Sequence, residues 1–199
     1  MENSDNNQNY QKMTFYIKHM YCNRCRLAVT SEFEKLGVRA SFVGVGEVKT
    51  FNRVSAGQRE KLKIALQKSG FELIDEKKSK LIEKIIGILP EMVYYSEEQL
   101  RATLPEYLSK KLNHDYTFLS KLFFDVKNIT IEKYFIANKI EVAKELMVYY
   151  KLNLTEIAYQ LNYSSVAYLS SQIKAVTGFP PLHFEQITQK RRHIEVMCE

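Results

Sequence analysis

The chain of 199 residues contains no tryptophan, only three cysteines and only four histidines. It has no uninterrupted run of about 18 apolar residues, so no transmembrane helix and no membrane partner are expected. Three cysteines in this length do not make a disulfide framework, which agrees with a reducing compartment. The first twelve residues are polar and lack the apolar core of a signal peptide. We therefore expect a cytoplasmic protein that begins with a disordered tail (residues 1–12).

Groupings typical of catalysis are also missing. The four histidines (His19, His114, His183 and His193) lie in separate segments. No nucleophile is paired with a base, and no glycine-rich phosphate loop is present. We therefore expect the protein not to be an enzyme.

Charge and composition give only weak indications of function. The net charge is +6 and 45% of the residues are apolar, which is enough for the cores of one or two domains. The surplus of positive charge favours nucleic acid as a partner, but it is spread along the chain. The only dense basic cluster is Lys190–Arg192, in a C-terminal tail (residues 190–199).

Residues 13–76 show the pattern of a small α+β domain. Alternating or apolar segments predict strands at residues 14–19, 38–43, 47–51 and 71–74. Helices are expected over residues 22–36 and after Ser55, with inward positions Leu27, Phe33, Leu36, Leu62, Ile64, Ala65 and Leu66. Strand–helix–strand–strand–helix–strand is the order of the ferredoxin-like fold.

Two cysteines, Cys22 and Cys25, lie in the loop between the first strand and the first helix of this domain. Residues 20–25 (Met-Tyr-Cys-Asn-Arg-Cys) resemble the Met-x-Cys-x-x-Cys loop of heavy-metal-associated (HMA) domains, and residues 69–71 resemble the Gly-aromatic segment of that family. The resemblance implies that Cys22 and Cys25 bind Cu(I) or another soft metal ion. Thiolates suit such an ion, and the helix N-terminus and Arg24 would lower their pKa.

Other uses of this cysteine pair stay open. His19 and Tyr21 stand where the HMA family has glycine and a small or acidic residue. Two cysteines do not complete a tetrahedral zinc site, so zinc would need His19, a second chain or water. The pair can also be a reversible dithiol that senses oxidants, or it can be purely structural.

A short charged linker (residues 77–80) is expected to precede an amphipathic helix. The apolar positions of this helix are Leu81, Ile82, Ile85, Ile86, Leu89 and Val93, and Pro90 predicts a kink. The helix is either the first of a C-terminal domain or a dimerisation helix. The second alternative makes a homodimer a candidate assembly.

Residues 152–184 predict three short helices. Thr155 can cap the first, whose inward positions are Ile157, Ala158 and Leu161. Asn162 stands where the turn needs left-handed backbone, and the second helix (165–176) has one apolar face. That face contains Val166, Leu169, Ile173 and Val176. Gly178 ends this helix, and two prolines begin the last one. The pattern fits a helix-turn-helix, although an ordinary helical hairpin fits it too.

An internal repeat indicates a second unit of the same kind. Leu112–Asn113 recurs as Leu161–Asn162, about fifty residues later. In the first copy, Thr103 and Asp115 can cap helices ending at Leu112 and Val126, and a capping box is expected at residues 96–99. Between the copies, residues 131–149 predict one helix with apolar positions Ile136, Ile140, Ala143, Leu146 and Met147. Its length is about 28 Å.

The segments 157–165 (Ile-Ala-Tyr-Gln-Leu-Asn-Tyr-Ser-Ser), 167–174 and 177–184 (Thr-Gly-Phe-Pro-Pro-Leu-His-Phe) resemble AraC-type (AraC/XylS) transcriptional regulators. Asn162, Leu169, Ile173 and Glu185 depart from the family, which has Gly, Phe, Phe and Arg there. The resemblance covers residues 81–189. It implies a DNA-binding domain with two helix-turn-helix units joined by a long helix, and it makes RNA polymerase a candidate partner. The expected class of the whole chain is α+β.

The leading hypothesis is a bacterial transcriptional regulator that binds double-stranded promoter or operator DNA and responds to a soft metal. The family pattern places base-reading positions on the outward faces of both second helices. These positions are Thr117, Ser120, Lys121, Ala167, Ser170, Ser171 and Lys174. The alternative is a metal-trafficking or redox-sensing protein whose helical domain docks a partner protein.

Overall fold

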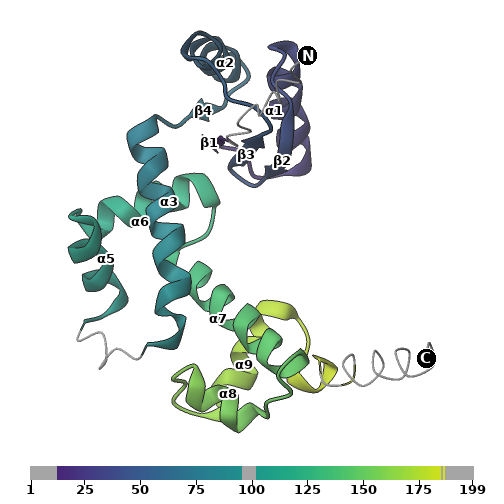
Figure 1. Cartoon of the computed structure of the whole chain (residues 1–199), viewed down its shortest axis with the longest axis vertical. Helices are drawn as coiled ribbons and strands as arrows, with labels where there is room; N and C mark the ends of the chain where they lie inside the picture. Colours follow the sequence, from purple (N-terminus) through teal and green to yellow (C-terminus); the bar gives the residue numbers. More distant parts are fainter. Residues whose placement is uncertain (1–12, 96–101, 185, 187–199) are drawn as a thin grey trace, which may run out of the picture. The chain divides into compact units, whose positions relative to one another are not determined.

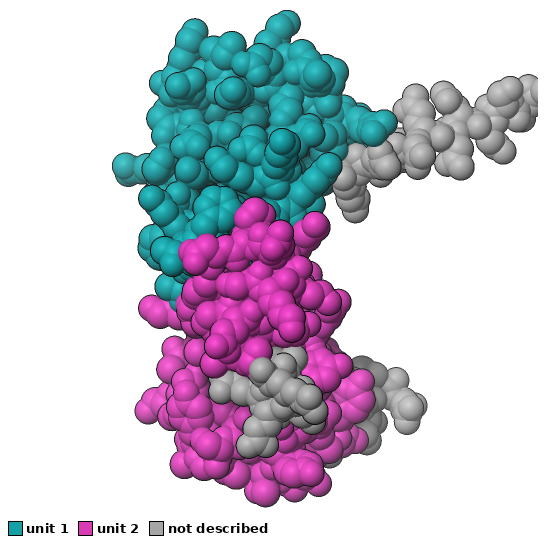
Figure 2. Space-filling view, turned by 90° about the vertical axis from the view of Figure 1, so that its left-hand side faces the viewer, with its two compact units in different colours: residues 1–83, 117–130 teal, residues 84–116, 131–199 magenta. Residues whose placement is uncertain are grey.

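The computed structural model describes residues 13–95, 102–184 and 186. In these ranges the chain is α+β, because a four-stranded antiparallel sheet is followed along the sequence by helices (Figure 1). It forms two compact units: unit 1 has residues 1–83 and 117–130, and unit 2 has residues 84–116 and 131–199 (Figure 2). None of the described helices is long and apolar enough to cross a membrane. Both tails and the expected capping box at 96–99 lie outside the described residues.

Unit 1 begins with the order of strands and helices that the sequence predicts. Its strands are β1 (Thr14–Lys18), β2 (Ala40–Gly44), β3 (Glu47–Thr50) and β4 (Glu72–Leu73). Its first two helices are α1 (Asn23–Lys35) and α2 (Ala56–Lys68). The strands lie in the order β2-β3-β1-β4, and each neighbouring pair is antiparallel. β1 is therefore a central strand with partners on both sides.

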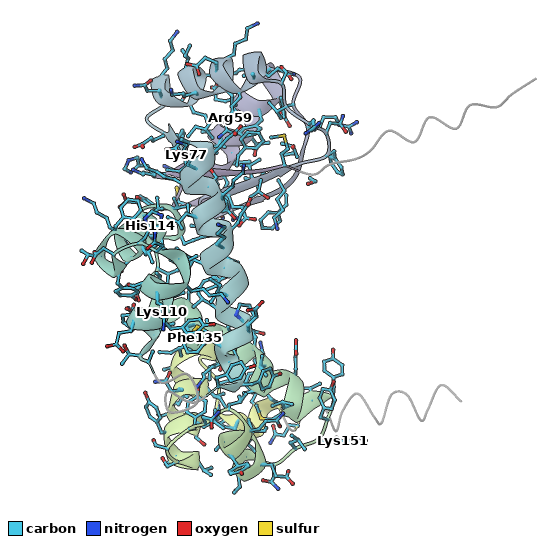
Figure 3. All side chains as sticks on the ribbon, turned by 60° about the vertical axis from the view of Figure 1, so that its left-hand side comes forward. Arg59, Lys77, Lys110, His114, Phe135 and Lys151 are labelled. Atoms are coloured by element: carbon cyan, nitrogen blue, oxygen red, sulfur yellow. The ribbon has the colours of Figure 1, made fainter. Side chains whose placement is uncertain are left out.

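One face of this sheet packs on α1 and α2. Phe15 from β1, Phe33 from α1 and Leu66 from α2 belong to one buried apolar cluster. Arg59 lies at its edge, with its guanidinium 5.3 Å from the centre of the Phe15 ring (Figure 3). The same guanidinium donates to the carbonyl oxygen of Ile74 at 3.0 Å. The charge of Arg59 is thus kept at the surface while its stem covers the core.

Two predicted inward positions on these helices are wrong. Leu27 on α1 is 72% exposed, and Ile64 on α2 is 48% exposed. Val29 and Leu62, each two positions away, are fully buried. Because a helix turns by about 100° per residue, positions two apart point to nearly opposite sides. The burial of Val29 and Leu62 therefore turns Leu27 and Ile64 to solvent.

Residues 77–80, predicted to be a linker, belong instead to helix α3 (Glu76–Glu91). The side chain of Asp75 accepts a hydrogen bond from the backbone N–H of Lys78 at 2.9 Å, which caps the start of the helix. Lysine and glutamate are strong helix formers, so a charged segment without glycine or proline continues a capped helix. The helix ends one residue after Pro90.

The remaining helices follow in the predicted order. They are η1 (a 3-10 turn, Met92–Tyr94), α5 (Leu104–Leu112), α6 (Tyr116–Lys127), α7 (Ile131–Val148), α8 (Leu154–Gln160) and α9 (Val166–Thr177). Thr103 precedes α5 as predicted, and its backbone N–H donates to Glu106 at 2.9 Å. α8 is capped by Asn153 and not by Thr155. The side-chain oxygen of Asn153 accepts from the N–H groups of Thr155 and Glu156 at 3.0 Å each.

The described core of unit 2 surrounds the C-terminal half of α7. It contains Val93, Ile140, Ala143, Leu146, Met147, Ile157, Ala158, Leu161, Leu169 and Ile173. Most of these residues are inward positions predicted from helical periodicity. Val176, also predicted to face inward, is 41% exposed. It lies about one turn after Ile173, in the last turn of α9.

Candidate nucleic-acid interface and thiol loop

A tight turn joins α8 to α9 in unit 2. Asn162 has the left-handed backbone that the sequence predicts, with φ of 54°. Its side-chain amide donates to the carbonyl oxygen of Tyr94 at 3.0 Å. The ammonium of Lys139 on α7 donates to the carbonyl oxygen of Leu161 at 2.9 Å. The turn is therefore fixed to η1 and to α7, and this sets the direction in which α9 leaves it.

The two copies of the internal repeat share this backbone feature. Asn113, at the end of α5, is also left-handed, with φ of 54° and ψ of 45°. Its backbone N–H donates to the carbonyl oxygen of Ser109. Asparagine tolerates this conformation at small cost. The sequence repeat of Leu112–Asn113 and Leu161–Asn162 thus corresponds to a repeated local structure.

The outward side of α9 carries small and polar side chains. Ala167, Ser171 and Lys174 are exposed, and Ser170 is half-buried. Spacings of four and three residues place the three exposed positions on one helix face. The hydroxyl of Ser171 donates to the carbonyl oxygen of Tyr168 at 2.8 Å, which leaves its oxygen free to accept. These exposed positions of α9 therefore carry a small, a polar and a cationic side chain.

Two tyrosines on the same unit were not among the predicted contacts. Tyr159 on α8 is 88% exposed and Tyr168 on α9 is 49% exposed. The ring of Tyr168 lies 5.8 Å from that of Tyr163, and burial, followed by the nearby Tyr168, raises the pKa of Tyr163 to about 12. Tyr163 therefore stays neutral beneath Tyr168. The position of Tyr159, two residues after the inward Ile157, is the sequence signal that would have found it.

α6 has the faces that the sequence predicts. Its buried side chains are Leu119, Leu122, Phe123 and Val126. Thr117 and Lys121 are exposed, Ser120 is half-buried, and Phe124 is 47% exposed. The predicted base-reading residues of this helix therefore lie on the accessible side of its first two turns.

The other end of α6 is anchored on the sheet of unit 1. Tyr16 on β1 and Glu47 on β3 are directly opposite each other, so they lie on the same sheet face as Lys18. Lys127 of α6 forms an ion pair with Glu47, and its ammonium lies 5.2 Å from the centre of the Tyr16 ring. Asp125 of α6 forms an ion pair with Lys18 at 3.4 Å. α6 thus covers part of the sheet face that α1 and α2 leave open.

Electrostatics favour this contact. Burial raises the pKa of Glu47, but hydrogen bonds and charges from Lys127 and Lys49 outweigh it and hold the pKa below its ordinary value. Burial likewise lowers the pKa of Lys18, and Glu72 and Asp125 outweigh it, so that the net shift is upward. The side chains of Lys127 and Glu47 are only 12% and 13% exposed. This ion pair is therefore largely shielded from water and salt.

The predicted metal ligands lie together at the start of α1. Cys22 is the N-cap residue of this helix, and its sulfur accepts from the backbone N–H of Cys25 at 3.4 Å. The two sulfur atoms are 3.1 Å apart and hydrogen-bonded. The thiol of Cys22, and then the backbone at Cys22 and Tyr21, lower the pKa of Cys25. Arg24, which the sequence suggested as a cause, is exposed and does not contribute to this shift.

The donor set of this loop suits an ion that two thiolates can satisfy. The nearby His19 has a left-handed φ of 68°, and its Nδ1 is hydrogen-bonded to the hydroxyl of Tyr21 at 3.3 Å. Within the described residues, no group of three or more His, Cys, Asp or Glu side chains is arranged to hold a metal. The residues therefore fit Cu(I), which two soft ligands can hold, better than tetrahedral zinc.

Comparison with known proteins gave no match to a protein-family profile and none to a curated protein. Several solved structures are similar to about half of the chain. The C-terminal domain of AraT, a response regulator from Geobacillus stearothermophilus, is 20% identical with a TM-score of 0.48, over 54% of this chain and 84% of that one. A DNA-binding transcriptional dual regulator from Escherichia coli K-12 is 12% identical with a TM-score of 0.47, over 55% and 93%. The C-terminal domain of the two-component response regulator yesN from Fusobacterium nucleatum subsp. nucleatum ATCC 25586 is 26% identical with a TM-score of 0.45, over 52% and 95%.

Proposed function

We propose that the protein is a sequence-specific, double-stranded-DNA-binding transcriptional regulator of AraC type. The observation that carries this proposal is the outward face of α9. Its exposed side chains Ala167, Ser171 and Lys174 are small, polar or cationic, while Leu169 and Ile173 lock the opposite face into the core. A rigid helix with such a face, following a tight turn from a shorter helix, suits the major groove of DNA.

In this proposal α6 is the recognition helix of the first helix-turn-helix and α9 is that of the second helix-turn-helix. α7, which lies between these two motifs in the sequence, has 18 residues. It is therefore about 27 Å long. Successive major grooves on one side of B-DNA lie about 34 Å apart. A rod of this length suits one chain that reads two adjacent grooves, so an asymmetric site needs no homodimer.

Each exposed residue has a definite chemistry toward DNA. Lys121 would donate to guanine O6 and N7 or to a phosphate. Ala167 would contact a thymine methyl group. Ser171, whose proton is used within α9, would accept from an adenine or cytosine amino group. Thr117, Ser120 and Ser170 would add weaker polar contacts, and Lys174 a phosphate contact.

The test is DNA affinity of the full chain. A preferred site is first selected from random duplexes, and affinity is then measured by fluorescence anisotropy at fixed salt. We expect Lys121→Ala to weaken binding about tenfold and to relax preference at one position if it contacts guanine. Ser171→Ala should cost roughly fivefold. Lys61→Ala, on the exposed surface of α2, is the control for lost charge. Equal affinity and preference in all variants would contradict the assignment of both recognition faces.

We propose a second function for residues 13–76, as a ferredoxin-like domain of HMA type. In this proposal the domain binds a soft metal ion, and this binding regulates the DNA-binding helices. The observation in its favour is the convergence of the Cys22 and Cys25 sulfur atoms, 3.1 Å apart at a helix N-terminus. The strand order β2-β3-β1-β4 supports the fold. Metal trafficking to a docked partner protein, or redox sensing by the same dithiol, is the alternative use of these residues. None of these functions is enzymatic.

The metal proposal predicts one Cu(I) bound per reduced chain, measured by competition with a chromogenic chelator. Cys22→Ser with Cys25→Ser should abolish this binding, because serine oxygen is a poor ligand for a soft ion. Cys198→Ser, outside the described residues, is the control and should keep it. Retention of full Cu(I) affinity by the double serine variant would overturn the assignment of the ligands.

A further inference from the structure

We propose that the β-sheet of unit 1 positions α6 by holding the C-terminal turn of this helix, and that Met20 and Gly46 couple this turn to the Cys22–Cys25 loop. The inference deepens the proposed function and rests on it, since it takes α6 as the first recognition helix. It assigns a role to the contact between α6 and the sheet, which DNA binding alone does not explain. Three independent contacts support it.

Two of these contacts are the ion pairs of the last turn of α6. Lys127 reaches Glu47 on β3, and Asp125 reaches Lys18 on β1. Lys18 also pairs with Glu72 on β4 at 3.2 Å. The last turn is therefore tied to β3 and β1, and Lys18 on β1 is itself paired with β4. The two tethers also hold the helix against rotation about its axis, because they act on side chains two positions apart.

The third contact is made by backbone. Gly46 lies in the turn between β2 and β3, is buried, and has φ of 65°. A Cβ atom at this position would collide with the carbonyl oxygen of Val126 and would lie 2.8 Å from its carbonyl carbon. The turn therefore touches the backbone of α6 at a point where only glycine leaves room. A shift of this turn must move α6 or open the contact.

The same turn is bonded to the thiol loop. The N–H of Gly46 donates to the carbonyl oxygen of Met20 at 3.3 Å, and its carbonyl oxygen accepts from the N–H of Ile17 at 3.0 Å. Met20 is fully buried in the core and precedes Cys22 by two residues. The half-buried Cys25 packs against the same core. A rearrangement of the two sulfur atoms around an ion would thus reach Val126 through Met20 and one glycine.

The C-terminal turn of α6 contacts the sheet, whereas the residues proposed to contact bases lie in its N-terminal turns. Val126 lies nine residues after Thr117, about 13 Å along the helix axis. Bases are read from the N-terminal part of a recognition helix. A small tilt at the anchored turn is therefore enlarged at Thr117 and Lys121. This gives the thiol loop a means to change DNA affinity without any contact with DNA.

The experiment uses the reciprocity of coupling. If a change in the thiol loop shifts α6, then removal of the contacts between α6 and the sheet must change the stability of the thiol loop. Hydrogen exchange of the full, reduced chain is followed by mass spectrometry in peptides covering residues 19–26 and 120–128. The test variant is Asp125→Asn with Lys127→Met, which leaves the net charge and residues 13–76 unchanged. The control is Glu141→Gln with Lys144→Met, which removes a surface pair of 2.7 Å from α7.

We expect the test variant to speed exchange in both peptides at least threefold and to weaken DNA binding about fivefold, with the control close to wild type in each. Faster exchange in residues 120–128 alone would overturn the coupling to the thiol loop. Unchanged exchange in both peptides would overturn the anchoring itself. Wild-type DNA affinity in a variant with faster exchange would overturn the positioning role. If no chain binds specific DNA, the proposed function fails, while the exchange data still decide the coupling.

Discussion

Replacement of Gly46 by alanine should destabilise unit 1 by about 3 kcal/mol. Alanine at a left-handed φ costs about 1–2 kcal/mol, and forced overpacking of a tight contact adds about 1–3 kcal/mol. Both penalties apply here, since φ is 65° and the added methyl group would meet the carbonyl group of Val126. The backbone cannot relieve the collision as a flexible side chain would. The measurement is native-state hydrogen exchange of the β1 amides, which reports the free energy of opening of this unit.

Alanine substitutions at two other glycines distinguish the penalty for the left-handed backbone from the penalty for the collision with Val126. Gly37 has φ of 70° and open space on the side where a Cβ atom would lie, so Gly37→Ala should cost only the backbone penalty of about 1 kcal/mol. Gly57 lies in the first turn of α2 with open space around it, and Gly57→Ala should stabilise the helix by at most about 1 kcal/mol. Equal losses in Gly46→Ala and Gly37→Ala would show that α6 does not press on the β2–β3 turn.

Local structure was predictable wherever one residue type decides it. Asn162 takes the left-handed backbone that was predicted for it, and Asn113, its counterpart in the repeat, takes the same conformation. Thr103 and Ser55 precede the helices they were expected to cap. Asn153 was missed as a cap because Thr155, two residues later, is an equally good capping type. Asparagine and threonine are both preferred N-cap residues, so residue type alone does not decide which of the two positions precedes the first turn of the helix.

Which face of each short helix is buried was harder to predict. Leu27 and Ile64 are apolar, yet each lies on the solvent side of its helix. With helices of 13 residues, several apolar positions can define competing faces, and packing on the sheet decides between them. In this protein the sheet packs on the faces that contain Val29 and Leu62. For α7, where more apolar positions repeat over 18 residues, the predicted face was mostly correct.

The contact between α6 and the sheet left no clear signal in the sequence. Tyr16 alternates with Phe15 and Ile17 as expected for a strand with one exposed face, yet all three are buried. Lys127 and Glu47 are 80 residues apart, and nothing local marks them as partners. The outward position of the residues proposed to read DNA was predictable from helical periodicity, whereas the residues that contact the sheet from α6 depend on the tertiary structure.

Replacement of Lys127 by methionine should destabilise unit 1 by about 3 kcal/mol at pH 7. Removal of one member of a buried ion pair leaves the other charge unpaired, which typically costs about 3–5 kcal/mol. Here the lower end applies, because Lys49 still lies 3.1 Å from Glu47. The matched change Lys144→Met removes an ion pair whose carboxylate is 62% exposed, and it should cost less than about 1 kcal/mol. Similar losses in the two variants would show that the Lys127–Glu47 pair is not shielded as its burial implies.

Acid should remove most of the difference between wild type and Lys127→Met. The pKa of Glu47 is held below its ordinary value of 4.5, so ionised Glu47 contributes stability above that pH and loses it as pH falls through the lowered pKa. In Lys127→Met, burial of Glu47 is opposed only by Lys49, so its pKa rises and protonation no longer costs stability. Wild type should therefore lose stability in acid while the variant changes little, and the two curves of opening free energy against pH should converge. Glu47→Gln with Lys127→Met should recover much of the loss at pH 7, because it leaves no charge buried alone. Curves that stay parallel down to acid would assign the effect of Lys127 to its stacking on Tyr16 and not to its charge.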